Sequence, residues 1–163
     1  MSSSDGTAQS TVLVIDMKPN FEFMRSPSAI LMVVNIVLLF FAWVIMATWN
    51  NYYYYSSFSS KISFFLATTV IPWLIFSILF FVFLCKVHIK LAAVNWPLAL
   101  MINCGVWTLL VFISSIIIPQ LSSKYAIPGL GSASAFGFFS TFGMAIQALF
   151  HFKEYRSHSQ LSR

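Results

Sequence analysis

Few side chains in this sequence can do chemistry, and their positions limit what that chemistry can be. The four acids lie near the two ends of the chain: Asp5, Asp16, Glu22 and Glu154. General acid–base catalysis, carboxylate metal sites and hydrolysis by paired acids need groups that the long stretch between residues 23 and 153 lacks. The sequence therefore predicts a protein that is not an enzyme, with no catalytic residue, no metal site and no cofactor.

The two cysteines, Cys85 and Cys104, lie in apolar surroundings, and no CxxC or Cys/His ligand spacing occurs. Neither a disulfide framework nor a zinc site is predicted. A membrane enzyme would be considered only if activity required Cys85 or His88. Cys85 directly precedes Lys86 at the end of an apolar run, a place where reversible palmitoylation occurs. An ordinary role as a small apolar packing residue fits Cys85 equally well.

Composition sets the protein class. Of 163 residues, 59% are hydrophobic and 8% are charged, whereas soluble domains have about 45–50% and about 25%. The 18 Phe, 6 Tyr and 5 Trp would not be tolerated by water unless lipid or protein covered them. The net charge of +5 comes from bases scattered between apolar runs, so the sequence predicts a membrane surface as partner and no nucleic acid.

Four apolar runs are long enough to cross about 30 Å of hydrocarbon as helices. They cover residues 28–48, 62–85, 97–118 and 131–150. Residues 1–27 then form an N-terminal segment, residues 151–163 form a tail, and loops cover 49–61 and 119–130. The predicted fold class is all-α, an integral membrane four-helix bundle spanning residues 28–150.

The distribution of basic residues predicts the orientation of the bundle. Of the nine Lys and Arg residues, only Lys61 and Lys124 fall in the loops 49–61 and 119–130. The other seven share the opposite side of the membrane: Lys18, Arg25, Lys86, Lys90, Lys153, Arg156 and Arg163. Because basic residues are enriched in cytoplasmic loops, both termini are predicted to be cytoplasmic, in the plasma membrane or in endomembrane vesicles.

The predicted spans contain uncharged polar residues and neither charges nor histidines. The main ones are Asn35, Thr68, Thr69, Ser77, Asn103, Thr108, Ser114, Ser115 and Gln147. Hydrogen bonding between helices is the ordinary role of such groups, so Asn35 and Asn103 are predicted helix-packing residues. A solute pathway lined by these groups is the alternative, although large side chains leave little lumen in a small bundle.

The fourth span carries a row of small residues. This row, called the small-residue row below, consists of Gly129, Ala133, Gly137, Thr141 and Ala145. Residues four apart lie on one helix face, so the row predicts a surface that another helix can approach closely. The partner is either the first span of the same chain or a second copy of the chain.

Several short segments carry a family resemblance. They are 25–27 and 43–48 around the first span, 96–103 and 118–119 in the third, and 135–139 and 152–156 in the fourth. Through them the chain resembles the MARVEL four-span membrane proteins and is most similar to the chemokine-like factor (CMTM) group. The resemblance implies roles in vesicle trafficking, cholesterol-rich membrane domains, membrane apposition and fusion, and stabilisation of partner membrane proteins.

The leading functional hypothesis is a non-enzymatic membrane organiser, and the alternative is a small channel or transporter. The expected partners are membrane lipids, other integral membrane proteins and a second copy of the chain. Cholesterol is a candidate lipid, because Lys61, Phe64 and Leu66 fit a proposed sterol-contact pattern of basic, aromatic and branched aliphatic residues.

Overall fold

A computed structural model describes residues 21–53, 59–86, 95–125 and 128–161. Within these ranges the chain forms the short helix α1 (Phe21–Met24) and four long helices. The long helices are α2 (Pro27–Tyr53), α3 (Ser59–Leu84), α5 (Trp96–Tyr125) and α6 (Pro128–Leu161). Residues 1–20 of the predicted N-terminal segment and residues 162–163 of the tail lie outside the described residues.

Each long helix is apolar enough to cross a membrane. The candidate spans are Pro27–Trp49, Ser60–Leu84, Trp96–Lys124 and Gly129–Ser157. The predicted all-α fold class, a membrane bundle of four helices, is confirmed, and the protein is a multi-pass integral membrane protein.

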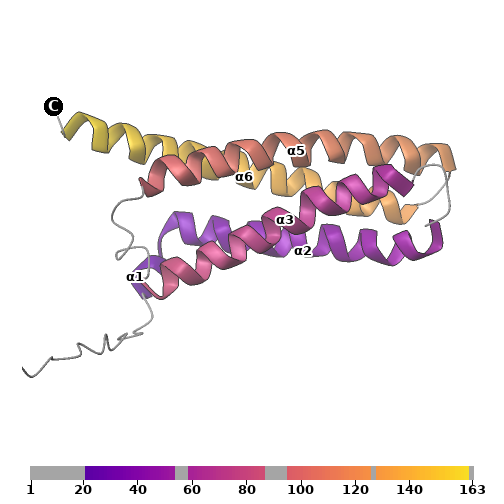
Figure 1. Cartoon of the computed structure of the whole chain (residues 1–163), viewed down its shortest axis with the longest axis horizontal. Helices are drawn as coiled ribbons and strands as arrows, with labels where there is room; N and C mark the ends of the chain where they lie inside the picture. Colours follow the sequence, from indigo (N-terminus) through magenta and orange to yellow (C-terminus); the bar gives the residue numbers. More distant parts are fainter. Residues whose placement is uncertain (1–20, 54–58, 87–94, 126–127, 162–163) are drawn as a thin grey trace, which may run out of the picture.

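The four helices run antiparallel to their neighbours (Figure 1). Around the bundle, α2 packs against α3 and α6, and α5 packs against the same two helices. The first residues of α2 and α5 and the last residues of α3 and α6 therefore lie at one end, together with α1 (Figure 1). This end is called the α1 end below, and the other is called the far end.

Helix starts and stops follow local side-chain chemistry. Ser26 Oγ accepts a hydrogen bond from the backbone N–H of Ala29 at 3.2 Å, and Pro27 takes the first helical position of α2. Asn95 Oδ1 accepts from the N–H of Leu98 at the start of α5. After the last residue of α3, Lys86 has a φ of 56°, the left-handed conformation with which helices commonly terminate.

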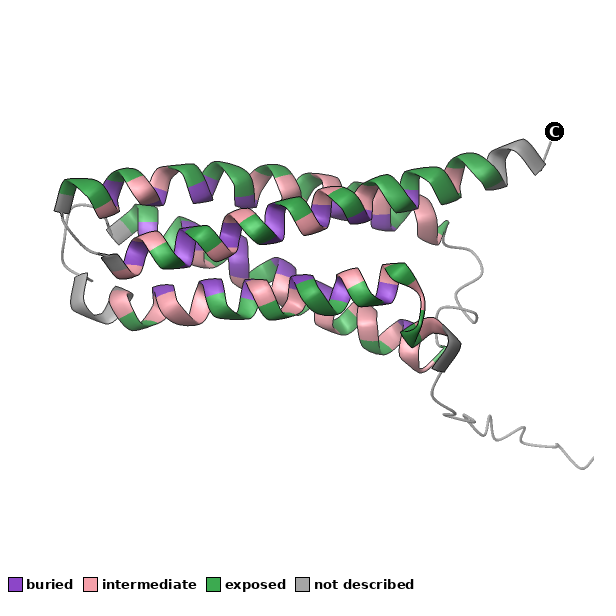
Figure 2. Ribbon diagram, turned by 180° about the vertical axis from the view of Figure 1, so that it is seen from behind, coloured by how far each residue is buried: buried purple, intermediate pink, exposed green. Residues whose placement is uncertain are grey.

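Polar and apolar side chains are arranged as a membrane protein requires. Large apolar side chains are exposed on all four long helices, and the buried residues line the inner faces (Figure 2). The most exposed are Phe81, Leu109, Phe139, Phe142 and Leu149, each more than 60% exposed. The buried polar residues include Asn35, Thr69, Ser114, Ser140 and Gln147. Lipid can accept the apolar exterior, and the interior removes the polar side chains from lipid.

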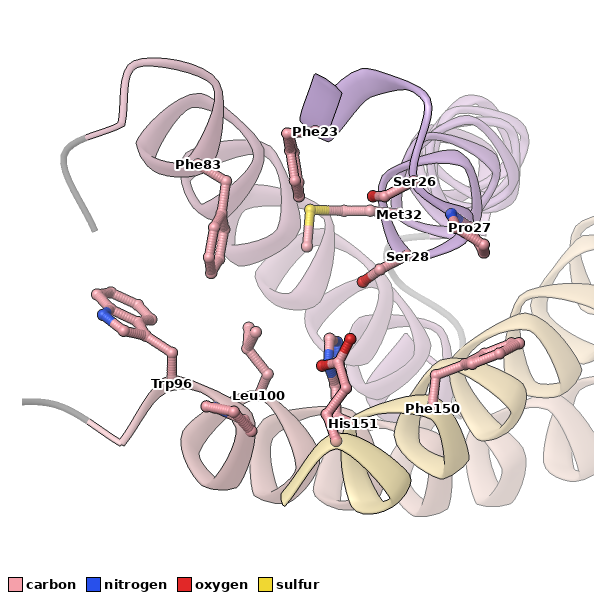
Figure 3. A pocket seen from close by; sticks show the side chains of 12 residues that line it. Phe23, Ser26, Pro27, Ser28, Met32, Phe83, Trp96, Leu100, Phe150 and His151 are labelled. Carbon is pink, nitrogen blue, oxygen red and sulfur yellow. The ribbon is translucent and has the colours of Figure 1, made fainter. Parts of the chain in front are cut away.

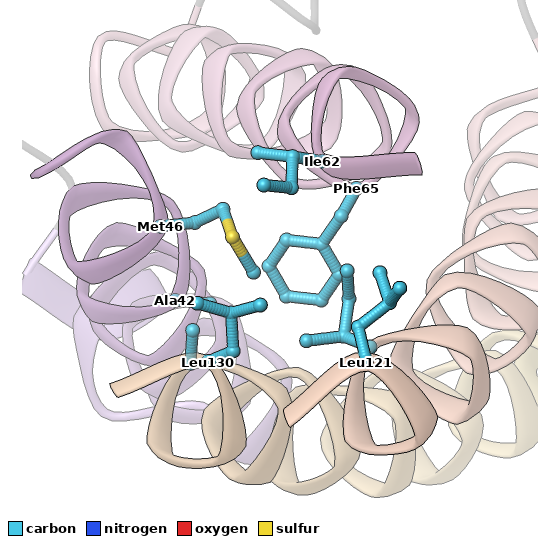
Figure 4. Packing of buried hydrophobic residues seen from close by; sticks show 8 residues of the cluster. Ala42, Met46, Ile62, Phe65, Leu121 and Leu130 are labelled. Atoms are coloured by element: carbon cyan, nitrogen blue, oxygen red, sulfur yellow. The ribbon is translucent and has the colours of Figure 1, made fainter. Parts of the chain in front are cut away.

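Apolar packing fills the interior at two levels. Near the far end, side chains from all four helices converge, among them Met46, Ile62, Phe65, Leu121 and Leu130 (Figure 4). A second cluster nearer the α1 end contains Met32, Leu39, Phe76, Cys104, Val111 and Met144. Close packing of these side chains occupies the space that a lumen would need.

The two predicted loops, 49–61 and 119–130, are too long, because α2 continues to Tyr53, α3 begins at Ser59 and α6 begins at Pro128. Helix α5 continues through Pro119 to Tyr125. Proline removes the N–H that would bond to the carbonyl four residues earlier, which here belongs to Ser115. The hydroxyl of Ser134, on α6, donates to this carbonyl at 2.7 Å. The neighbouring helix thus supplies the missing hydrogen bond, and the proline does not end the helix.

Candidate helix-packing site

The small-residue row lies on the inner side of α6. Ala133, Gly137 and Thr141 are buried, whereas Gly129 and Ala145 are half-buried. The spacing of four residues slowly rotates around a helix of 3.6 residues per turn, so the ends of the row move away from the centre of the contact.

The glycines of this row mark points of close approach to other helices of the same chain. A Cβ atom added at Gly129 would overlap the indole of Trp49 on α2. A Cβ atom added at Gly137 would overlap the hydroxyl of Ser115 on α5 and touch the ring of Phe65 on α3. A side chain at either position would have to displace these neighbours.

Gly143, which is outside the row, makes a third close approach. A Cβ atom at this position would overlap Oδ1 of Asn35 on α2. The row misses Gly143 because a repeat of four follows a single stripe, whereas α6 contacts α2 and α5 with two adjacent stripes. A search for every small residue in the span would have found it.

Asn35 makes the polar contact between α2 and α6. Its Nδ2 donates to Oε1 of Gln147 at 2.9 Å, and both side chains are fully buried. Oδ1 of Asn35 and Nε2 of Gln147 have no hydrogen-bond partner in the described part of the chain. Inside a membrane this amide pair holds the two helices in one register, because sliding either helix would leave both amides unpaired.

Asn103 contacts its own helix. Its Oδ1 accepts from Nε1 of Trp107 at 3.1 Å, one turn along α5. Its Nδ2 is buried without a partner among the described residues. The structure therefore shows Asn35 bridging two helices and gives Asn103 a hydrogen bond within α5 only.

Hydroxyl groups connect two further helix pairs. Thr68 Oγ1 on α3 lies 2.9 Å from Ser114 Oγ on α5, and the Ser114 hydroxyl lies 3.0 Å from the carbonyl of Val111. With the Ser134 to Ser115 bond between α6 and α5, polar contacts join three of the neighbouring helix pairs. An interhelical hydrogen bond of this kind contributes about 0.6 kcal/mol to the stability of a membrane protein.

Cys85 lies directly after the last residue of α3 at the α1 end and is half-buried. Cys104 is fully buried in the second apolar cluster. Both thiols are free. Among the residues that the structure describes, no group of three or more His, Cys, Asp and Glu side chains could hold a metal ion.

The described basic residues divide unequally between the two ends of the bundle. Arg25, Lys86, Lys153 and Arg156 belong to the α1 end, and Lys61 and Lys124 belong to the far end. An end rich in basic residues is attracted to the anionic lipids of a cytoplasmic leaflet. The side of the membrane that each end faces remains a prediction.

Comparison with known proteins identifies the family. No curated protein and no solved structure matches the chain. Residues 23–150 match the model of the MARVEL family, described as a membrane-associating domain. This match includes all four candidate spans except the end of the last one. With its bundle of four membrane helices, the chain belongs to the MARVEL family.

Proposed function

We propose that the protein is a non-enzymatic membrane organiser of the MARVEL family. Its four helices sort lipids or stabilise other integral membrane proteins during vesicle trafficking, membrane apposition or fusion. Within the family we place it in the chemokine-like factor (CMTM) group, on the sequence segments that resemble that group.

One observation carries this proposal. Large aromatic and aliphatic side chains are exposed on every long helix, while the interior is filled by two apolar clusters and by polar contacts. A membrane protein built this way acts through its outer surface, where lipids and the helices of other proteins pack. The same filled interior favours an organiser over the alternative of a small channel or transporter.

The packing residues have a defined part in this function. The small-residue row and Asn35 hold α6 against α2 and α5, and we assign Asn103 to the same role through its helix. A rigid bundle keeps its outward side chains in fixed positions, which a partner helix needs for specific packing. The Lys61, Phe64 and Leu66 pattern at the far end remains a proposed contact for cholesterol in this model of function.

Proximity labelling from a tag on the full chain in its native cell tests the proposal. We expect the labelled set to contain integral membrane proteins, and at least one of them to turn over faster when the chain is removed. Re-expression of the wild-type chain should restore that half-life. Unchanged abundance and location of every labelled membrane protein would contradict the proposal.

A second measurement separates the organiser from the channel. The purified chain is placed in sealed phosphatidylcholine liposomes, and release of small solutes is followed. We expect release no faster than from liposomes without protein. Solute flux that depends on the chain would replace the organiser with the channel.

A further inference from the structure

A cavity of about 360 Å³ opens at the α1 end of the bundle (Figure 3). All five described helices contribute to its wall. The wall is mainly apolar, and its largest side chains are Phe23, Met32, Phe83, Trp96, Leu100 and Phe150. It lies where candidate membrane spans begin or end, which places it near the headgroup region of one leaflet.

Aromatic contacts give this wall a defined shape. The rings of Phe23 and Phe83 stack with their centroids 5.3 Å apart, and Phe83 meets Trp96 edge to face at 5.3 Å. Ring pairs at such separations are attractive. Through Phe23, the short helix α1 is held against the end of α3, and it forms one side of the cavity.

His151 is the buried polar side chain of the cavity. It lies on α6 and is 2% exposed, and its ring extends toward the same space as the Ser28 hydroxyl of α2 (Figure 3). Its Nδ1 lies 3.1 Å from Oε2 of Glu154, one turn further along α6. Its Nε2 is buried and has no hydrogen-bond partner in the described ranges.

The contact with Glu154 sets the tautomer of a neutral His151 ring. A carboxylate only accepts hydrogen bonds, so in the neutral ring Nδ1 carries the proton and Nε2 presents a lone pair. An acceptor buried in apolar surroundings lacks the hydrogen bond that water would give it. A ligand that brings one donor to this point satisfies it.

These features define one class of ligand. The apolar wall needs an apolar body, and Nε2 needs a hydroxyl proton. A fatty acid carboxylate has no proton to donate, and the negative charge of Glu154 at the rim of the cavity repels it. We propose that this cavity binds a lipid alcohol, with the hydroxyl donating to Nε2 of His151 and the apolar body against the aromatic wall. The proposal needs only the membrane location of the chain and does not depend on the organiser function.

Photo-crosslinking in liposomes tests the proposal. The full chain in phosphatidylcholine liposomes is crosslinked to a photoreactive sterol in one arm and to a photoreactive diacylglycerol in the other. Each arm is competed with the unmodified alcohol or with its methyl ether, which lacks the hydroxyl proton. In at least one arm the alcohol should compete about two- to tenfold better than the ether, the range expected for one hydrogen bond. That arm identifies the source of the alcohol.

Variants locate the effect. His151→Phe keeps a ring of similar size without an acceptor, so the preference for the alcohol over the ether should disappear. Phe152→Leu is the control, because Phe152 is 49% exposed on the same turn of α6 and does not line the cavity. It should keep the preference, and the crosslinked peptides should include residues of the cavity wall.

Equal competition by alcohol and ether against the wild-type chain in both arms overturns the proposal. A preference that survives in a folded His151→Phe variant also overturns it. The wild-type comparison decides the matter even where His151→Phe fails to fold. The organiser function is tested separately, by the turnover of the labelled membrane proteins. A failed crosslinking experiment does not affect that test, so the two failures are distinguishable.

Discussion

Gly137 lies at the centre of the small-residue row, where α6 approaches α5 and the ring of Phe65 reaches across from α3. Replacing Gly137 with Leu would force a side chain against Ser115 and Phe65. Overpacking of this kind costs about 1–3 kcal/mol. Unfolding in a mixed lipid and detergent system should show a loss of stability in this range.

Gly105 provides the matched control for this prediction. A Cβ atom at Gly105 on α5 would meet nothing within 4 Å. Gly105→Leu is the same chemical change in a membrane helix, and it should leave stability within about 0.5 kcal/mol of the wild type. Equal losses for the two variants would show that Gly137 is not a packing position.

Cys85 and Cys104 differ in their access to lipid-modifying enzymes. Cys85 lies at the end of α3 beside Lys86, whereas Cys104 is fully buried. If the chain is acylated in cells, we expect the acyl group on Cys85. Acyl-exchange labelling should lose its signal in Cys85→Ser and keep it in Cys104→Ser. A signal that persists in Cys85→Ser would exclude this site.

At the scale of the helix, Pro119 and Ser134 form a pair across α5 and α6. Ser134→Ala would remove the hydroxyl that bonds the free carbonyl of Ser115. An unpaired buried carbonyl costs about 1–3 kcal/mol, so the variant should be less stable by that amount. In the Pro119→Ala background, the restored N–H of residue 119 can bond the carbonyl instead. Ser134→Ala should then cost much less, and equal costs in both backgrounds would disprove the coupling.

The contact of α2 with α6 within one chain is also testable at this scale. A Cβ atom at position 143 would lie 3.2 Å from Cγ of Asn35, so the two positions are close enough to test a disulfide between Asn35→Cys and Gly143→Cys. In a chain with Cys85→Ala and Cys104→Ala, oxidation should protect both new thiols from a maleimide polymer without changing the chain's mass on a denaturing gel. A covalent dimer would show instead that α6 packs on a second copy.

For the whole molecule, the antiparallel bundle brings the start of α2 and the end of α6 to the α1 end. The basic residues predict that this end is cytoplasmic. Ser157 lies toward the α1 end and Ser123 toward the far end, and both are exposed. In the chain without native cysteines, a membrane-impermeant maleimide should label Ser123→Cys in intact cells. Ser157→Cys should be labelled only after permeabilisation, and the opposite result would invert the topology.

The number and nature of the membrane spans follow from the sequence alone. About 20 consecutive apolar residues can satisfy their backbone in lipid only as a helix, so composition and length are sufficient to predict four helices. The family could also be inferred, because short segments such as 25–27 and 135–139 resemble segments of MARVEL proteins. Helix ends were less predictable. Pro119 predicts a loop, yet α5 continues through it, and Ser134 of another helix bonds the carbonyl that the proline leaves free.

Which residues meet across the bundle was decided by the tertiary structure. The sequence shows that Gly129 to Ala145 share a face, but the spacing does not say whether α2, α5 or a second copy covers it. The pairing of Asn35 with Gln147 joins residues 112 positions apart, and the approach of Gly143 to Asn35 lies outside any simple repeat. The cavity around His151 depends on five helices at once. In hydrocarbon the apolar side chains fit lipid and protein almost equally well, so the hydrophobic pattern carries little information about partners, and close packing and hydrogen bonds decide them.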